Sequence, residues 1–414
     1  MTSSTERTAA SSRIEPSQFH ILDPELVADF WPKVNDLRER CPVGWSDQPW
    51  SDSDSGYWFI NDYADVMAAA TNWRAFSSAQ GASPVQFNLD ILRMIPLETD
   101  PPLHRDIRKV LNPFFTPDAL QAREDEIKDI VNGLIDRCLA IAAAGDGTVD
   151  FIAEFTQRLP PLVFFVGFLG QKEDELDWII ETLQELISAP ERALELAPRL
   201  LMWDAELLER RRQEGRRDDM PGVIAHLGLD GSDGLELDER QRMETLNLMI
   251  MAGMETTMGG LASIALSVAQ QPEVRQTLID GGEQLLDRAA DEFLRLETPV
   301  TAAGRTLTKD VEMSGCPMHA GDRIVINWAA ANRDPAQFPN PDHLDFQRAN
   351  AASHVAFGAG IHRCLGNHLA RREVKAMIRA ICALSVFEIP ADFKPTYRVS
   401  IARGPVSLPV RIAR

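Results

Sequence analysis

Apolar positions along the chain recur mostly at helical spacing. One such stripe runs through residues 26–40, and the pattern continues through nearly all of residues 119–217, broken at glycines and prolines. Alternating or β-branched runs, which predict strands, concentrate at residues 57–61, 300–330 and 386–412. We therefore expect a mainly α fold with a smaller β-rich part.

The longest helical run covers residues 238–271 and would extend about 50 Å at the usual rise per residue. Its middle is apolar nearly all round and then becomes polar at Glu255 and Thr256. A glycine weakens a helix, and a threonine hydroxyl can bond back to a carbonyl one turn earlier. The sequence therefore predicts a local distortion at Ala252 and Gly253. A helix-packing glycine beside satisfied threonines is the plainer alternative.

The composition is that of an ordinary globular protein. Of 414 residues, 44% are hydrophobic and 25% are charged, which excludes disordered and fibrous classes. The formal net charge of −20 argues against a nucleic-acid partner, because phosphate binding needs clustered Lys and Arg. Residues 1–18 are rich in Ser, Thr and Ala and predict a disordered lead-in.

Cysteine usage and the N-terminal sequence predict a cytoplasmic protein. The five cysteines are odd in number and far apart in the sequence, which does not indicate a disulfide framework. The N-terminus lacks the apolar core of a signal peptide, and no uninterrupted apolar stretch reaches the roughly eighteen residues of a membrane span. We expect a soluble protein with neither export signal nor membrane anchor.

One glycine-rich loop presents a cysteine at the start of a predicted helix. Cys364 follows Phe357, Gly358 and Gly360 and precedes Gly366. Helix N-termini lower the pKa of a thiol, so a sulfur placed there can stay anionic and bind a metal. The glycines allow positive φ and close approach of the backbone to a flat group. Considered without the surrounding spacing, a single cysteine beside a helix could also be a buried, unreactive residue.

The spacing Phe-x-x-Gly-x-x-x-Cys-x-Gly, followed by Ala370 and Glu373, resembles the haem-ligand signature of the cytochrome P450 family. The resemblance implies the cytochrome P450 fold, a single haem domain over residues 19–414, and haem b (iron protoporphyrin IX) as cofactor. It also implies that Cys364 is the axial iron ligand and that Phe357, Gly358 and Gly366 contact the cofactor.

Four cationic residues match positions that bind the haem propionates in this family. Asp-Pro-Pro-x-His-x-x-x-Arg, which ends with His104 and Arg108, resembles the family's propionate-binding segment, and Arg305 and His362 match two further positions. Buried carboxylates need such partners. By spacing alone, His104 and Arg108 share a helix face that could as well be solvated.

The sequence Ala252-Gly-x-Glu255-Thr256-Thr resembles the family's oxygen-binding groove. The resemblance implies that Ala252 contacts the haem, that Thr256 hydrogen-bonds dioxygen, and that Glu255 relays protons from solvent.

Glu292-x-x-Arg295, together with Arg348, resembles the structural triad of the same family. For these three residues we predict a role in folding rather than in chemistry.

Family alignment also implies a substrate pocket that is apolar with one hydroxyl. The implied residues are Phe87, Leu248, Met251, Ala252, Val300, Thr301 and Ile401. Such a lining predicts a small hydrophobic substrate, namely a terpenoid, a fatty acid or an aromatic compound. Among bacterial members, the chain most resembles the camphor-hydroxylating type.

The resemblance implies a monooxygenase that uses O2 and two electrons to hydroxylate or epoxidise its substrate. The haem domain uses the whole length, so we expect a separate ferredoxin and ferredoxin reductase as electron donors. We also expect a monomer. The donor would dock on a basic patch made by Arg108, Lys109, Arg363, Arg371 and Arg372.

Three alternatives compete with this interpretation. A structural zinc site built from His354, His362, Cys364 and His368 fails on two counts, because the spacing is irregular for zinc and such a site does not explain the Gly-x-Glu-Thr helix about a hundred residues earlier. A haem-based sensor or carrier would need no acid and threonine in the long helix. A peroxide-driven peroxygenase characteristically lacks that pair.

Overall fold

The computed structural model describes residues 14–50, 56–84, 92–172, 176–188, 192–229 and 234–414. They divide into two compact units, each assembled from distant parts of the chain. Unit 1 takes its residues from 1–91, 288–364 and 396–406, and unit 2 from 92–287, 365–395 and 407–414. The single haem domain over residues 19–414 stays a prediction.

Ordered structure begins earlier than the predicted lead-in of residues 1–18 allows. Residues 1–13 lie outside the described residues, but Pro16–Gln18 form a 3-10 turn, η2. The Ser17 carbonyl accepts a 2.9 Å hydrogen bond from the Asp47 N–H, and Phe19 is fully buried. Burial of Phe19 in the core of unit 1 explains why order extends ahead of it.

Unit 1 is built on a five-stranded sheet with the order β1-β2-β8-β5-β3. Its strands are β1 (Val43–Ser46), β2 (Tyr57–Ile60), β3 (Phe76–Ser77), β5 (Ala302–Leu307) and β8 (Arg323–Asn327). Only β2 and β8 pair in parallel. A separate hairpin pairs β6 (Val311–Met313) with β7 (Cys316–Met318). The strands predicted at 57–61 and 300–330 are confirmed, whereas β1 and β3 escaped prediction.

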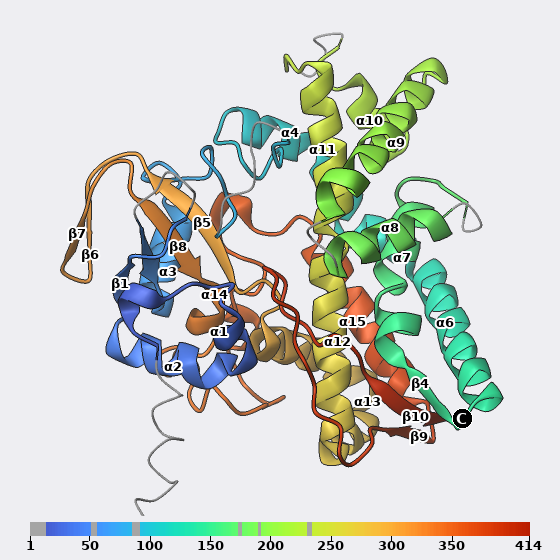
Figure 1. Cartoon of the computed structure of the whole chain (residues 1–414). Coiled ribbons are helices and arrows are strands. Elements are labelled where there is room, and N and C mark those ends of the chain that lie inside the picture. Colours follow the sequence, from blue (N-terminus) through green and yellow to red (C-terminus); the bar gives the residue numbers. More distant parts are fainter. Residues whose placement is uncertain (1–13, 51–55, 85–91, 173–175, 189–191, 230–233) are drawn as a thin grey trace, which may run out of the picture. The chain divides into compact units, whose positions relative to one another are not determined.

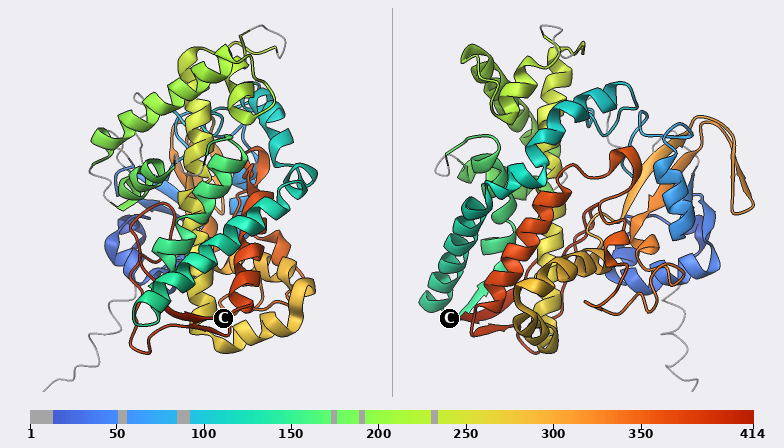
Figure 2. Two further views of the ribbon diagram at one scale, coloured as in Figure 1. Left: turned by 90° about the vertical axis from the view of Figure 1, so that its right-hand side faces the viewer. Right: turned by 180° about the vertical axis from the view of Figure 1, so that it is seen from behind.

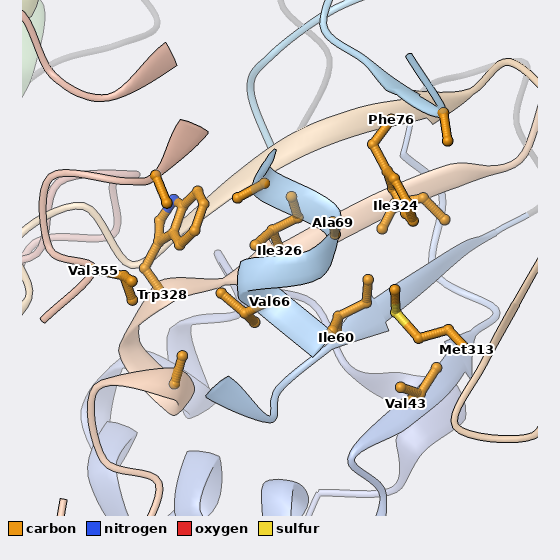
Figure 3. Close-up of a cluster of buried hydrophobic side chains, with 14 of the residues drawn as sticks. Val43, Ile60, Val66, Ala69, Phe76, Met313, Ile324, Ile326, Trp328 and Val355 are labelled. Atoms are coloured by element: carbon orange, nitrogen blue, oxygen red, sulfur yellow. The ribbon is translucent and has the colours of Figure 1, made fainter. Parts of the chain in front are cut away.

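Helices cover both faces of this sheet. They are α1 (Pro24–Ala28), α2 (Phe30–Arg40), α3 (Tyr63–Thr71) and α14 (Trp328–Ala331), with the 3-10 turns η7 (Ala351–Ser353) and η8 (Gly360–His362). Successive side chains of a strand point to opposite faces. Accordingly, Val325 packs into the core shared with α1 and α2, while Ile324 and Ile326 pack toward Val66 and Ala69 of α3 (Figure 3).

The helix predicted over residues 26–40 is interrupted at Asp29, which has φ −134°. Pro32 explains the interruption, because a proline ring clashes with the carbonyl of the residue four positions earlier, here Ala28. The sequence therefore forms two short helices, α1 and α2, rather than one.

Unit 2 is mainly helical. Its helices are α4 (Leu103–Leu111), α5 (Pro117–Gln121), α6 (Glu124–Ala144), α7 (Leu159–Gly167), α8 (Asp177–Ser188), α9 (Ala193–Gln213), α10 (Met220–His226), α11 (Glu239–Ala252), α12 (Glu255–Gln270) and α15 (Asn367–Cys382), with the short turns η3 (Asn112–Phe115) and η4 (Ile152–Thr156). Helix α13 (Pro272–Glu297) kinks at Gly282, where φ is 52°, and passes from unit 2 to unit 1 along the chain.

A three-stranded sheet completes unit 2, with the order β4-β10-β9. Its strands are β4 (Thr148–Asp150), β9 (Val386–Glu388) and β10 (Pro409–Ala413). The predicted strand region at 386–412 is confirmed. Strand β4 directly follows the predicted helix break at Gly145 and Gly147, but a strand there was not predicted, because its conformation depends on antiparallel pairing with β10, far away in the sequence.

Helices α11 and α12 run end to end as one column (Figure 1). Every residue from Met258 to Ala269 is buried, and α12 packs against α7, α15, η4 and β9 (Figure 2). Among the described residues, Glu239–Gln270 is the one helix whose length and apolar character would suffice to cross a membrane. Because 67% of its apolar window is buried within the protein, a core helix accounts for it.

Candidate functional site

The cysteine-bearing loop of unit 1 is shaped by glycines. Gly358 and Gly360 have φ values of 65° and 69°, in the left-handed region that favours glycine. A Cβ on Gly360 would lie 2.2 Å from the carbonyl oxygen of Ala70 in α3, so a side chain cannot fit there. The loop closes where the Cys364 N–H donates to the Phe357 carbonyl at 2.9 Å. These two glycines behave as the sequence predicted.

Gly366 differs from that expectation. Its φ is −82°, which any residue can adopt, and a Cβ there would meet no atom within 4 Å. Its predicted contact with a bound group stays a prediction. Along the chain, α15 begins at Asn367, three residues beyond Cys364.

Cys364 is the exposed member of the five cysteines, all of which the structure describes. Burial raises the pKa of Cys138 to about 12 and also raises the pKa of Cys41 and Cys382. Deeply desolvated thiols are poor thiolates and poor ligands. Accessibility therefore singles out Cys364 as the sulfur best placed to bind a metal.

The column of α11 and α12 in unit 2 breaks where the sequence predicted a distortion. Helix α11 ends at Ala252, Gly253 and Met254 form a turn, and α12 starts at Glu255. The Thr256 hydroxyl donates to the Ala252 carbonyl at 2.9 Å. Ala252 is exposed, and Glu255 and Thr256 are half-buried. An acid and a hydroxyl thus occupy consecutive positions directly after a helix break. Their predicted roles in proton transfer stay predictions.

A buried ion-pair network lies within unit 1. The carboxylate of Glu292 accepts two hydrogen bonds of 2.8 Å from Arg295 and further bonds of 3.0 and 3.1 Å from Arg348. The Asp345 N–H donates to the same carboxylate at 3.0 Å. The structure thus brings together the three residues that the sequence grouped. Their role in folding stays a prediction.

Asn332 connects this network to the cysteine-bearing loop, a link that sequence reasoning missed. Its carbonyl accepts from Arg295 at 2.9 Å, and its side-chain oxygen accepts from the Val355 N–H at 2.7 Å. Its amide nitrogen donates to the Thr298 hydroxyl at 2.8 Å. The available signal was the Asn-Arg-Asp-Pro string that begins at Asn332, which is polar in the sequence although Asn332 is fully buried.

Comparisons with known proteins identify the family. A family model described as "Cytochrome P450" matches residues 151–395, more than half of the chain. This chain belongs to the cytochrome P450 family. The P450 fold, a mainly α arrangement with a smaller β-rich part, is therefore confirmed, as are the monooxygenase class and haem b as cofactor.

Curated relatives and solved structures agree with this assignment. A "Putative cytochrome P450 126" of Mycobacterium tuberculosis is 29% identical over 83% of this chain and 84% of its own length. A "Steroid C26-monooxygenase" of Mycolicibacterium smegmatis is 29% identical over 88% of this chain and 87% of its own. The crystal structure of CYP108D1 from Novosphingobium aromaticivorans aligns with TM-score 0.79 and 28% identity, covering 95% of this chain and 97% of the other.

Two of the predicted propionate partners, His104 and Arg108, belong to unit 2. His104 and Arg108 lie one turn apart on α4, and His104 is 4% exposed. Burial and the neighbouring Arg108 charge lower the pKa of His104 to about 4. A pKa of about 4 leaves His104 neutral near pH 7, so Arg108 carries the positive charge of the pair and the imidazole can still donate a hydrogen bond. A carboxylate beside them would favour protonation of His104 again, so the pair suits an anionic group.

The remaining predicted propionate partners belong to unit 1. Arg305 is buried on β5, with 4% exposure, and donates to the neighbouring Gly304 carbonyl at 2.6 Å. His362 is half-buried at the end of η8, two residues before Cys364. Together with the exposed Cys364 thiol, Arg305 and His362 offer a soft ligand for haem iron and polar partners for the anionic propionates.

The predicted substrate residues fall into two groups. In unit 1 the Thr301 N–H donates to the Ile401 carbonyl at 3.4 Å, and Val300 forms a β-bridge with Ala402, so these segments are neighbours.

In unit 2, Leu248, Met251 and Ala252 are spaced to share one face of α11, of which Leu248 is buried. Phe87 lies outside the described residues.

The zinc alternative is not supported. Within the described residues, no group of three or more His, Cys, Asp or Glu side chains is arranged to hold a metal ion. His354 instead accepts a 3.1 Å hydrogen bond from the Ala356 N–H and lies 3.4 Å from Asp291. Both ring nitrogens of His354 therefore already have a partner within the protein, which leaves neither for a metal ion.

The members of the predicted basic patch differ in their exposure to solvent and in whether an acidic side chain pairs with them. Lys109 and Arg363 are exposed, and Arg108 is half-buried. Arg372 pairs with Glu124 and also donates to the Pro117 carbonyl. Arg371 donates to the Asn367 side chain at 3.0 Å. Arg372 is therefore largely neutralised within unit 2 and is a poor candidate for attracting an acidic partner.

Proposed function

We propose that this cytochrome P450 hydroxylates or epoxidises a small hydrophobic substrate and that the Cys364 thiolate would hold its haem iron. The exposure of Cys364, in contrast to the half-buried or buried state of the other four cysteines, is the observation that carries this assignment. Phe357 and Gly358 would line the cofactor beside it, and His104, Arg108, Arg305 and His362 would neutralise its propionates.

Thr256 and Glu255 are the proposed catalytic residues. Haem iron, when bound, supplies reductive activation of O2 with two electrons. The Thr256 hydroxyl both donates and accepts hydrogen bonds, so it can hold a proton at Oγ1 for transfer toward O2. Glu255 is adjacent and half-buried, and its carboxyl would return protons to Thr256 from solvent. A sensor, a carrier or a peroxygenase would have no use for this pair.

The proposed substrate is a terpenoid, a fatty acid or an aromatic compound. Leu248, Met251, Val300 and Ile401 offer apolar surface, and the Thr301 hydroxyl offers one polar contact. Phe87 is a further proposed contact. Two relatives are named steroid C26-monooxygenases, those of Mycolicibacterium smegmatis and Rhodococcus jostii, which also favours an apolar carbon skeleton.

Electrons are proposed to come from a separate ferredoxin and ferredoxin reductase, with the P450 acting as a cytoplasmic monomer. Arg108, Lys109 and Arg363 would attract an acidic ferredoxin despite the net charge of −20. Reversing the charges of Lys109 and Arg363, the two exposed members, should slow reduction and flatten its dependence on salt. Arg372→Glu serves as control and should have a smaller effect on reduction. Unchanged reduction in the double variant, with full haem content, would remove the docking proposal.

The ligand assignment is tested by spectroscopy of the reduced carbon-monoxide complex. The wild-type protein should give the red-shifted Soret band of a thiolate-ligated haem, and Cys364→Ser should lose it while retaining some haem. Cys382→Ser is the matched control and should behave as wild type. An unchanged band in the Cys364 variant would refute the assignment.

The substrate class is tested by a ligand screen that follows the spin state of the ferric haem. Apolar ligands that enter the pocket should displace iron-bound water and convert the haem to high spin. Replacing Leu248 with Trp should weaken the response to the best ligands without altering the carbon-monoxide spectrum. A response confined to polar or charged ligands would contradict the proposed substrate class.

A further inference from the structure

Two cysteines of unit 1 that are remote in sequence converge on one backbone carbonyl. Cys41 follows the last residue of α2, and Cys316 is the first residue of β7. Their sulfur atoms lie 3.4 Å and 3.9 Å, respectively, from the carbonyl oxygen of Val43 in β1. The two sulfurs can be no farther apart than the sum of these distances. No pattern in the sequence indicates this proximity.

The surrounding residues hold both thiols in place. A Cβ on Gly44 would lie 2.4 Å from the sulfur of Cys41, so glycine at this position makes room for the thiol against β1. Cys316 packs against the core cluster that contains Val43 and lies opposite Met313 in the β6–β7 hairpin. Both cysteines are half-buried, which leaves them accessible to small molecules.

The two sulfurs also influence each other electrostatically. Burial, and secondarily the neighbouring Cys316, raises the pKa of Cys41. This makes Cys41 a poorer nucleophile than an ordinary exposed thiol, because the thiolate is the reactive form.

We propose that Cys41 and Cys316 form a peroxide-responsive thiol pair that closes to an intramolecular disulfide. The Cys316 thiolate attacks one oxygen of hydrogen peroxide, the O–O bond breaks, and hydroxide leaves to take up the thiol proton as water. The product is a sulfenic acid on Cys316. The Cys41 sulfur then attacks the Cys316 sulfur, the S–O bond breaks, and a second water leaves with the Cys41 proton. Two thiols lose two electrons in total, and one peroxide gains them.

The disulfide would tie the β6–β7 hairpin to the junction between α2 and β1. Because the bond closes a very long loop of chain, it restricts the unfolded state strongly. We expect the midpoint of thermal unfolding to rise by about 5 °C. Oxidation would thus stabilise unit 1 through residues that take no part in the proposed catalysis, so this inference does not depend on the proposed function.

The test treats the haem-loaded wild-type protein with one equivalent of hydrogen peroxide and measures intact mass and thermal unfolding. The expected result is a loss of about 2 Da, a peptide linking Cys41 to Cys316 in a non-reducing digest, and reversal by dithiothreitol. Cys41→Ser and Cys316→Ser should each abolish the loss of mass and the gain in midpoint. Cys382→Ser is the matched control and should retain both.

Two results would overturn the proposal. One is oxidation of wild-type protein that links other cysteines or links two chains. The other is stepwise gain of oxygen on Cys41 or Cys316 without a link between them. Both can be read on the wild-type protein alone, so the test remains decisive even if a serine variant folds poorly.

Discussion

The Thr256 hydroxyl donates a 2.9 Å hydrogen bond to the Ala252 carbonyl, across the turn between α11 and α12. This bond replaces part of the helical hydrogen bonding that Gly253 and Met254 interrupt. The threonine therefore stabilises the break and at the same time keeps its oxygen at that turn. The same side chain carries the proton in the mechanism that we propose.

Thr256→Ala is expected to separate electron consumption from product formation. Without the hydroxyl, the delivery of protons to O2 is no longer directed by this side chain. The amount of product formed per electron pair should therefore fall about tenfold, and hydrogen peroxide should accumulate. Thr256→Ser retains the hydroxyl and should recover most of the coupling. Thr257→Ala is the control at the next position. The test measures the amounts of product and peroxide formed against the amount of electron donor consumed. If Thr256→Ala still converted every electron pair into product, the proposed role of Thr256 in proton transfer would be excluded.

Glu292→Gln is expected to destabilise the protein strongly. The change removes the charge that neutralises Arg295 and Arg348, both of which are at least nine-tenths buried. Breaking a buried ion pair costs about 3–5 kcal/mol, so the denaturant midpoint should fall clearly. Glu195→Gln removes the acid of an exposed helix pair with Arg192 and should leave the midpoint unchanged. Equal midpoints for the two variants would show that Glu292 does not brace the fold.

Asp204→Asn should change how stability depends on pH. Asp204 in α9 is 1% exposed and accepts a 2.8 Å hydrogen bond from Asn247 of α11. Burial raises the pKa of this carboxyl to about 7. Between about pH 4 and pH 7 the unfolded chain loses the Asp204 proton while the folded chain keeps it, so stability falls as pH rises.

Asparagine cannot ionise and can still accept from Asn247. The variant should therefore be more stable than wild type above pH 7, by roughly 1–4 kcal/mol, and equally stable near pH 4. Denaturant unfolding across this pH range measures the difference. A constant difference at every pH would show that Asp204 does not titrate as inferred.

Glu373→Gln should show the same behaviour displaced to higher pH. Glu373 in α15 is 2% exposed, its Oε2 atom has no hydrogen-bond partner among the described residues, and burial raises the pKa of its carboxyl to about 8. In the wild-type protein, the loss of unfolding free energy due to Glu373 should therefore keep growing up to about pH 8. The corresponding loss due to Asp204 should stop growing about one pH unit lower. Unfolding of the Asp204 and Glu373 variants side by side tests the order. Loss of haem from Glu373→Gln at neutral pH would instead indicate a structural role.

Much of the fold and of the candidate site could be predicted because it depends on local sequence. The helix break at Gly253 follows from glycine flexibility and threonine back-bonding, both of which act within one turn. Gly358 and Gly360 mark the cysteine-bearing loop because their backbone conformation excludes other residues. The split between α1 and α2 was equally local, since Pro32 requires it, but the apolar stripe masked the proline in the prediction.

The sequence by itself determined the helical pattern, the break before Thr256 and the glycine-shaped loop before Cys364, since each follows from interactions between residues a few positions apart. Only the tertiary structure decided that β4 is a strand, that Asn332 joins the Glu292 network to the loop, and that Cys41 meets Cys316 at Val43. The physical reason is that pairing, burial and sulfur proximity arise from contacts between distant segments. Such contacts produce no repeating pattern of apolar and polar positions along the sequence, so the sequence does not predict them.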